Sequence, residues 1–107
     1  MTTFNDREKS FEKKFEKDQE LQFKVNARRN KLLGLWAAGL MGKSDADAEA
    51  YAKEVVVADF ETPGDSDVIA KLVKDLAAAG KPTEEHTIRK QADRLLDEAK
   101  KQLMETN

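Results

Sequence analysis

Three breaks constrain the fold of this chain more than any other feature of its sequence. Each follows a stretch of apolar residues at helical spacing, and the breaks are Gly42, Pro63-Gly64 and Gly80-Lys81-Pro82. Glycine commonly ends a helix, proline cannot continue one, and a Ser, Thr or Asp suited to capping a new helix follows each break. The pattern predicts helices at about residues 20–41, 45–61, 66–79 and 84–104.

Composition supports an all-α chain. The 107 residues include two prolines and five glycines, and the β-branched run Val55-Val56-Val57 is too short and isolated to form a paired strand. The predicted connections are only a few residues long, so successive helices should run antiparallel. We therefore expect a small antiparallel four-helix bundle over residues 20–107.

Apolar residues at helical steps predict which face of each helix is buried. Trp36 and Tyr51 fall on these faces and are interpreted as packing residues. Arg28, near the centre of the first face, is expected to pair with Glu54 or Asp59 of the next helix. The predicted core residues are Leu21, Val25, Leu32, Leu35, Trp36, Leu40, Ala48, Tyr51, Ala52, Val55, Val56, Phe60, Val68, Ile69, Leu72, Val73, Leu76, Ile88, Ala92, Leu95, Leu96, Ala99 and Leu103.

The residue types exclude several classes of site. There is no cysteine and a single histidine, His86, so a thiolate site and a cluster of histidine metal ligands are both excluded. The spacing of the carboxylates indicates no acid–base pair. We therefore expect no catalytic residue, no metal and no cofactor, and the protein is not expected to be an enzyme. The chain has neither an apolar run of about 18 residues nor a signal peptide, which predicts a cytoplasmic protein without direct membrane insertion.

Charge is segregated along the chain. Residues 21–43 carry five basic residues and no acid, whereas residues 44–68 carry eight acids against Lys53 alone. The simplest interpretation is that two consecutive helices of opposite sign complement each other within the fold. The alternative, that the basic stretch binds nucleic acid, is disfavoured because the acidic neighbour would cancel its field and the net charge is −2.

Residues 1–19 form a distinct N-terminal segment. Phe4, Phe11 and Phe15 are spaced seven and four residues apart, which places them on one face of a helix among charged residues. On one straight helix this face would lie about 90° from the apolar face of the next segment. Either the chain bends near residues 18–20, or the Phe face serves another surface.

A helix this short is marginal in water, so we expect a mobile segment, helical or disordered when free. Its phenylalanines either cover one end of the bundle or dock in a groove of a partner.

One string fits a relaxed phosphate-loop pattern, AAGLMGKS at Ala37–Ser44. A phosphate loop needs a preceding strand whose glycine-rich turn directs backbone amides at the phosphates. Here the preceding residues are predicted to be helical, so we interpret the string as a helix stop followed by the Ser44 cap. Weak contact of ADP or ATP with Lys43 and Ser44 stays open as a minor hypothesis.

Three stretches resemble the zeta subunit family, small inhibitors of the alphaproteobacterial F-type ATP synthase. They are FNDREKSFEKKFEKDQELQFK (Phe4–Lys24), ARRNKLLGLWAAGLMGK (Ala27–Lys43) and YAKEVVVADFE (Tyr51–Glu61). The resemblance covers essentially the whole chain and is strongest through residue 61. It implies a four-helix bundle preceded by a mobile inhibitory region, which becomes helical in a catalytic interface near the rotor subunit and blocks rotation in the hydrolytic direction.

Applied to this chain, the resemblance implies that the inserted segment is roughly Met1–Gln19. The apolar anchors would be Phe4, Phe11 and Phe15, and the polar contacts Arg7, Lys9, Lys13, Lys14 and Lys17. The partners would be the catalytic and rotor subunits, which place the protein at the periphery of the inner membrane, and we expect a monomer when free. Two other classes stay open, a regulatory module that binds adenine nucleotides and a generic helical scaffold for another partner.

Overall fold

The computed structural model describes residues 13–14, 17–61 and 65–106. Within them lie four helices and no strand, which confirms the predicted all-α four-helix fold; the helices are α2 (Gln19–Leu40), α3 (Asp45–Glu61), α4 (Asp65–Ala78) and α5 (Glu85–Thr106). None of these helices combines the length and the apolar character that crossing a bilayer requires. Five predicted partner-binding residues lie outside the described part of the chain, namely Phe4, Arg7, Lys9, Phe11 and Phe15.

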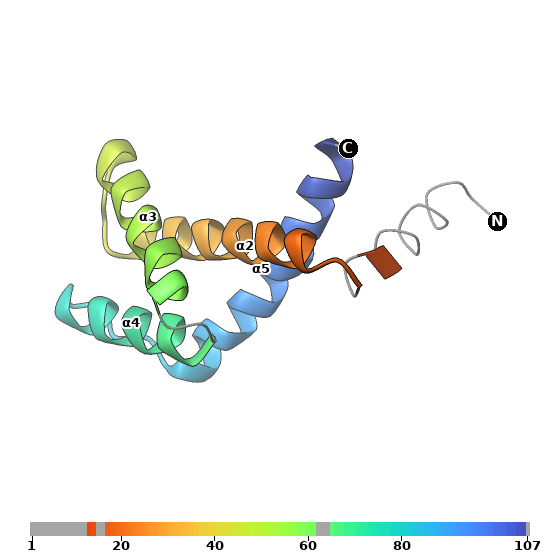
Figure 1. Ribbon diagram of the computed structural model, residues 1–107. Helices are drawn as coiled ribbons and strands as arrows, with labels where there is room; N and C mark the ends of the chain where they lie inside the picture. Colours follow the sequence, from red (N-terminus) through yellow and green to blue (C-terminus); the bar gives the residue numbers. More distant parts are fainter. Residues whose placement is uncertain (1–12, 15–16, 62–64, 107) are drawn as a thin grey trace.

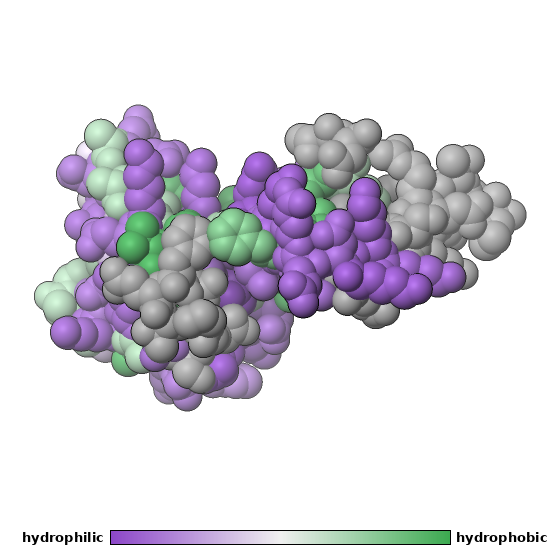
Figure 2. Space-filling model, in the orientation of Figure 1, coloured by the Kyte–Doolittle hydropathy of each residue, from purple (hydrophilic) through white to green (hydrophobic). Residues whose placement is uncertain are grey.

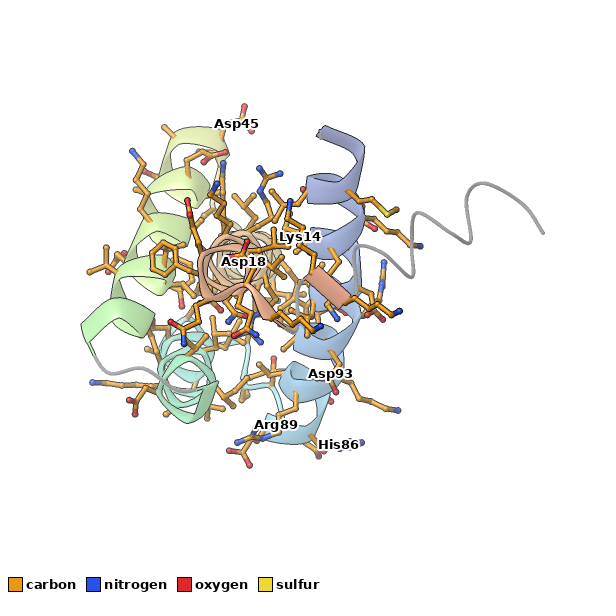
Figure 3. All side chains as sticks on the ribbon, turned by 45° about the vertical axis from the view of Figure 1, so that its right-hand side comes forward. Lys14, Asp18, Asp45, His86, Arg89 and Asp93 are labelled. Carbon is orange, nitrogen blue, oxygen red and sulfur yellow. The ribbon has the colours of Figure 1, made fainter. Side chains whose placement is uncertain are left out.

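α2 is the central helix of the arrangement (Figure 1). Viewed nearly along its axis, α2 lies between α3 and α5, with α4 beneath it (Figure 3). The two flanking helices cross α2 steeply and run in opposite directions, α3 toward α4 and α5 away from it. α2 therefore packs against other helices on several sides at once, whereas α3 and α5 each keep one side open to solvent.

Two glycines end helices by the same local motif. Gly42 and Gly80 have positive φ angles of 78° and 77°. Lys43 N–H donates to the Ala38 carbonyl and Lys81 N–H to the Leu76 carbonyl, over 3.0 and 2.9 Å. In both cases the glycine's own N–H bonds the carbonyl three residues back, which completes a Schellman motif at the helix end. The AAGLMGKS string therefore marks the end of a helix. Its backbone N–H groups donate to carbonyls of α2 and are not arranged to bind a phosphate.

The buried residues form two clusters. The main cluster joins all four helices, and its buried members are Leu33, Ala37, Ala38, Tyr51, Val55, Val68, Ile69, Leu72, Leu76, Ile88 and Ala92. The second cluster joins the first half of α2 to the second half of α5 through Leu21, Val25 and Ala99, with Leu32, Leu96 and Leu103 packed against it. The N-terminal half of α2 is therefore held mainly by the last helix of the chain.

The predicted apolar stripe of α2 is partly wrong in its second half, where Trp36 packs against the main cluster as predicted but Leu40 does not join it. Leu40 is 40% exposed, whereas Leu33, Ala37 and Ala38 are fully buried. The reason is close packing: a Cβ added to Gly34 would lie 2.8 Å from the Ala52 Cα, so α3 crosses α2 nearly backbone to backbone. Small residues make this approach possible, and the side of α2 that carries them turns toward α3.

Polar residues of α2 also differ from expectation. Arg28 donates to the Gln102 side chain of α5 over 2.8 Å, so its described partner lies on the last helix and not on Glu54. The neighbouring Arg29 and Asn30 are buried, and Arg29 Nε donates to the Asn30 Oδ1 over 2.8 Å. The charge complementarity predicted for α2 and α3 is represented among the described side chains by an exposed pair, with Lys31 Nζ 3.9 Å from Glu49, and such pairs contribute little.

Candidate functional site

The junction between the N-terminal segment and α2 lies at Asp18. Lys13, Lys14 and Lys17 are helical, Asp18 is extended with φ −102° and ψ 106°, and α2 begins at the next residue. Asp18 N–H donates to the Lys14 carbonyl over 2.8 Å, which closes the preceding helical turn. The Asp18 carboxylate accepts the Leu21 N–H over 3.2 Å and so caps α2. A sharp break therefore separates the two stretches.

The described lysines of the segment face solvent. Lys13, Lys14 and Lys17 are all exposed, and Lys14 and Asp18 lie at the near end of α2 in Figure 3. The surface over this end of α2 is hydrophilic (Figure 2), whereas apolar patches are scattered over other parts of the same face. The surface of the first turns of α2 also carries one large apolar side chain, Phe23, which is 54% exposed.

A second group of polar residues surrounds Tyr51, where α2, α3 and α4 meet. The Tyr51 ring is buried, and its hydroxyl donates to the Asp75 carboxylate of α4 over 2.8 Å. Lys71 Nζ donates to the same carboxylate oxygen over 2.9 Å and lies 5.3 Å from the centre of the Tyr51 ring. Lys43 Nζ lies 6.0 Å from the same ring, so two ammonium groups flank it.

The electrostatics of this group favour a neutral Tyr51 and a charged Asp75. Burial raises the pKa of Tyr51 above its ordinary value of 10.0, and the hydrogen bond to Asp75 raises it further. Partial burial alone would raise the pKa of Asp75, but the hydrogen bonds from Lys71 and Tyr51 outweigh it. The Asp75 pKa therefore lies below its ordinary value of 3.8. A neutral phenol and a charged carboxylate form a structural bridge here.

A shallow pocket of about 370 Å³ opens beside this group, and its lining includes Lys43, Tyr51, Glu54, Lys71 and Asp75. Two lysines and two carboxylates therefore meet at its wall. The pocket brings Lys43, but not Ser44, to this lining. Ser44 is exposed and lies at the start of α3, where its carbonyl accepts the Ala48 N–H over 2.7 Å.

The sequence interpretation missed the polar role of Tyr51. Its place on the apolar face of α3 predicted packing, which the buried ring confirms. No local signal links its hydroxyl to Asp75, 24 residues away on α4. Lys71 and Asp75, four residues apart on one helix, form an ion pair that could have been predicted from spacing.

Comparisons with known proteins cover nearly the whole chain. The family model of ATPase inhibitor subunit zeta matches residues 1–102. A solution NMR structure that is 47% identical in sequence superimposes with a TM-score of 0.72, over 81% of this chain and 99% of the other. No curated protein matches the chain. The family match includes both the N-terminal segment and the bundle.

Proposed function

Because the chain belongs to the ATPase inhibitor subunit zeta family, we propose that it inhibits ATP hydrolysis by the catalytic head of an F-type ATP synthase. In this proposal residues 1–19 are the inhibitory part. They enter an interface between catalytic subunits beside the rotor subunit, become helical there, and block rotation in the hydrolytic direction. The bundle stays outside, because four packed helices are too bulky to follow one helix inward. The protein then works at the periphery of the inner membrane, without chemistry of its own.

The observation that supports this division is the position of the core. Both buried clusters are built from residues 21–103, and the described residues before Gln19 contribute nothing to them. In this proposal the bundle folds without the segment. Lys13, Lys14 and Lys17 are exposed and available to a partner, and helix insertion into a groove is an established mode of recognition.

Deletion of residues 1–19 tests the proposal. We expect the truncated protein to keep its helical circular dichroism and its cooperative unfolding, since every described core residue lies outside the deletion. It should no longer inhibit ATP hydrolysis by the isolated catalytic head. Inhibition by the truncated protein at the potency of the full chain would show that the bundle, and not the segment, is the inhibitor.

A charge reversal at the junction gives a finer test with a matched control. Lys17→Glu places a like charge beside the acids of the segment and removes a predicted contact, so inhibition should weaken. Lys31→Glu reverses another exposed lysine, on the body of α2, whose ion pair with Glu49 is loose. The control should inhibit like the natural protein. Equal loss in both variants would indicate an effect of net charge alone.

A second candidate function, adenine-nucleotide binding, is supported by the pocket at Tyr51. Lys43 and Lys71 could face the phosphates of the nucleotide. The carboxylates of Glu54 and Asp75 offset their positive charge, so we expect the binding to be weak. In an ATP titration, amide shifts should be confined to residues near the pocket and disappear in Lys43→Ala. Lys53→Ala, outside this lining, serves as the control, and Ser44→Ala tests the minor role of Ser44. Unchanged binding in Lys43→Ala would exclude this site.

A further inference from the structure

Asp18 joins two helical stretches through a single residue. Its N–H closes the turn that begins at Lys14, and its carbonyl accepts the Gln22 N–H over 3.0 Å, which opens α2. The Leu21 N–H, which a continuous helix would give to the Lys17 carbonyl, donates to the Asp18 carboxylate. One extended residue thus interrupts a chain that is helical on both sides.

The flanking residues do not account for this break. Glu16, Lys17, Gln19 and Glu20 are all good helix formers, and no glycine or proline lies near. Asp18 differs from them because its short carboxylate competes for backbone amides, which makes it poor inside a helix and strong as an N-cap. The position of the break therefore depends on this one side chain.

The break changes where the segment can point. Without it, the segment and α2 would form one straight helix, and the helical spacing of the sequence would place the face of Phe11 and Phe15 about a quarter turn from the Leu21 and Val25 face that packs on α5. With the break, the direction in which the segment points does not depend on how α2 is rotated about its own axis. An apolar face can then meet a partner while α2 keeps its own face in the core.

We propose that Asp18 is a positioning residue, which holds the helix break that sets the direction of the N-terminal segment, and that inhibition requires this break. The second half of this statement rests on the proposed function; the first half concerns the isolated protein alone. Asp18 lies outside both buried clusters, so its replacement should leave the bundle folded.

The test compares Asp18→Leu with Asp18→Asn in the full-length protein. Asn keeps the capping acceptor, whereas Leu removes it and favours the helix interior. In the isolated proteins, the Cα chemical shift of residue 18 should be helical in the Leu variant and extended in the natural and Asn proteins. Thermal unfolding of the bundle should stay cooperative in all three, with at most the small destabilisation in the Leu variant that loss of one cap causes.

Inhibition of ATP hydrolysis is the second readout. We expect the protein concentration that gives half-inhibition to rise about tenfold in Asp18→Leu, because the variant loses a helix cap and gains a better helix former. In Asp18→Asn this concentration should stay near the value of the natural protein. An extended residue 18 in the Leu variant would overturn the assignment of the break to Asp18. A helical residue 18 with undiminished inhibition would overturn the requirement for the break. If the natural protein does not inhibit at all, the proposed function fails, and the shift measurement still decides the first half.

Discussion

The crossing of α2 and α3 can be tested by adding one methyl group. In Gly34→Ala the new Cβ would lie 2.8 Å from the Ala52 Cα, 3.2 Å from a Val55 methyl and 3.3 Å from the Ala52 Cβ. The shortest of these contacts is with a backbone atom, which cannot rotate away. The two helices must therefore separate, and the main cluster beneath them must repack.

Two opposing effects set the magnitude. Replacing glycine by alanine inside a helix stabilises by about 1 kcal/mol. Overpacking a tight core costs about 1–3 kcal/mol, and a backbone clash places Gly34→Ala near the upper end of that range. The net expectation is a loss of about 2 kcal/mol in the free energy of unfolding.

Gly39 supplies the matched control, because it lies on the same helix and a Cβ there would meet nothing within 4 Å. Gly39→Ala should leave stability unchanged or raise it by about 0.5–1 kcal/mol. Urea denaturation followed by circular dichroism measures the stability of both variants. Equal slopes of the free energy of unfolding against urea concentration would show that the two unfolding transitions are comparable. If Gly34→Ala proves as stable as Gly39→Ala, the close crossing of α2 and α3 is wrong.

Other substitutions probe the Tyr51 bridge and the core. Tyr51→Phe keeps the ring but loses the hydrogen bond to Asp75, which should cost about 0.5–1.5 kcal/mol in thermal or urea unfolding; an unchanged stability would contradict the bridge. The lowered pKa of Asp75 contributes stability that is present above its ordinary value of 3.8 and is lost as pH falls through the folded-state pKa. Asp75→Asn should therefore lower the free energy of unfolding at neutral pH, and this free energy should fall less on acidification than it does in the natural protein. Parallel pH profiles of the free energy of unfolding in the two proteins would contradict this expectation. Ile88→Ala should cost about 2–5 kcal/mol because Ile88 is fully buried, whereas the exposed neighbour His86→Ala should be close to neutral.

Local signals predicted much of this fold. The helix stops at Gly42 and Gly80 could be predicted because the left-handed conformation that they need is specific to glycine and is decided within a few residues. The break near Asp18 belongs to the same class, since a capping side chain and its target amide are three residues apart. The extended Asp18 falls within residues 18–20, where a bend was one of the two alternatives posed for the N-terminal segment, whereas the phenylalanines of that segment lie outside the described residues.

Contacts between distant residues could not be predicted in the same way. Arg28 bonds Gln102 on α5, 74 residues away, although its position on α2 suggested an acid of α3. The reason is that the first half of α2 faces α5 and only the second half faces α3, a change of partner that a single apolar stripe does not reveal. The same change explains why Leu33, and not Leu40, joins the core.

The second cluster has a consequence for how the protein folds. The α5 residues that cover Leu21 and Val25, namely Leu96, Ala99 and Leu103, lie more than 70 residues further along the chain. Closing so long a loop is slow compared with forming a helix, so the docking of α5 on the first half of α2 should follow the formation of the individual helices. A chain interrupted in α5 before Leu96 would leave Leu21 and Val25 uncovered, and exposed apolar surface of this kind favours degradation.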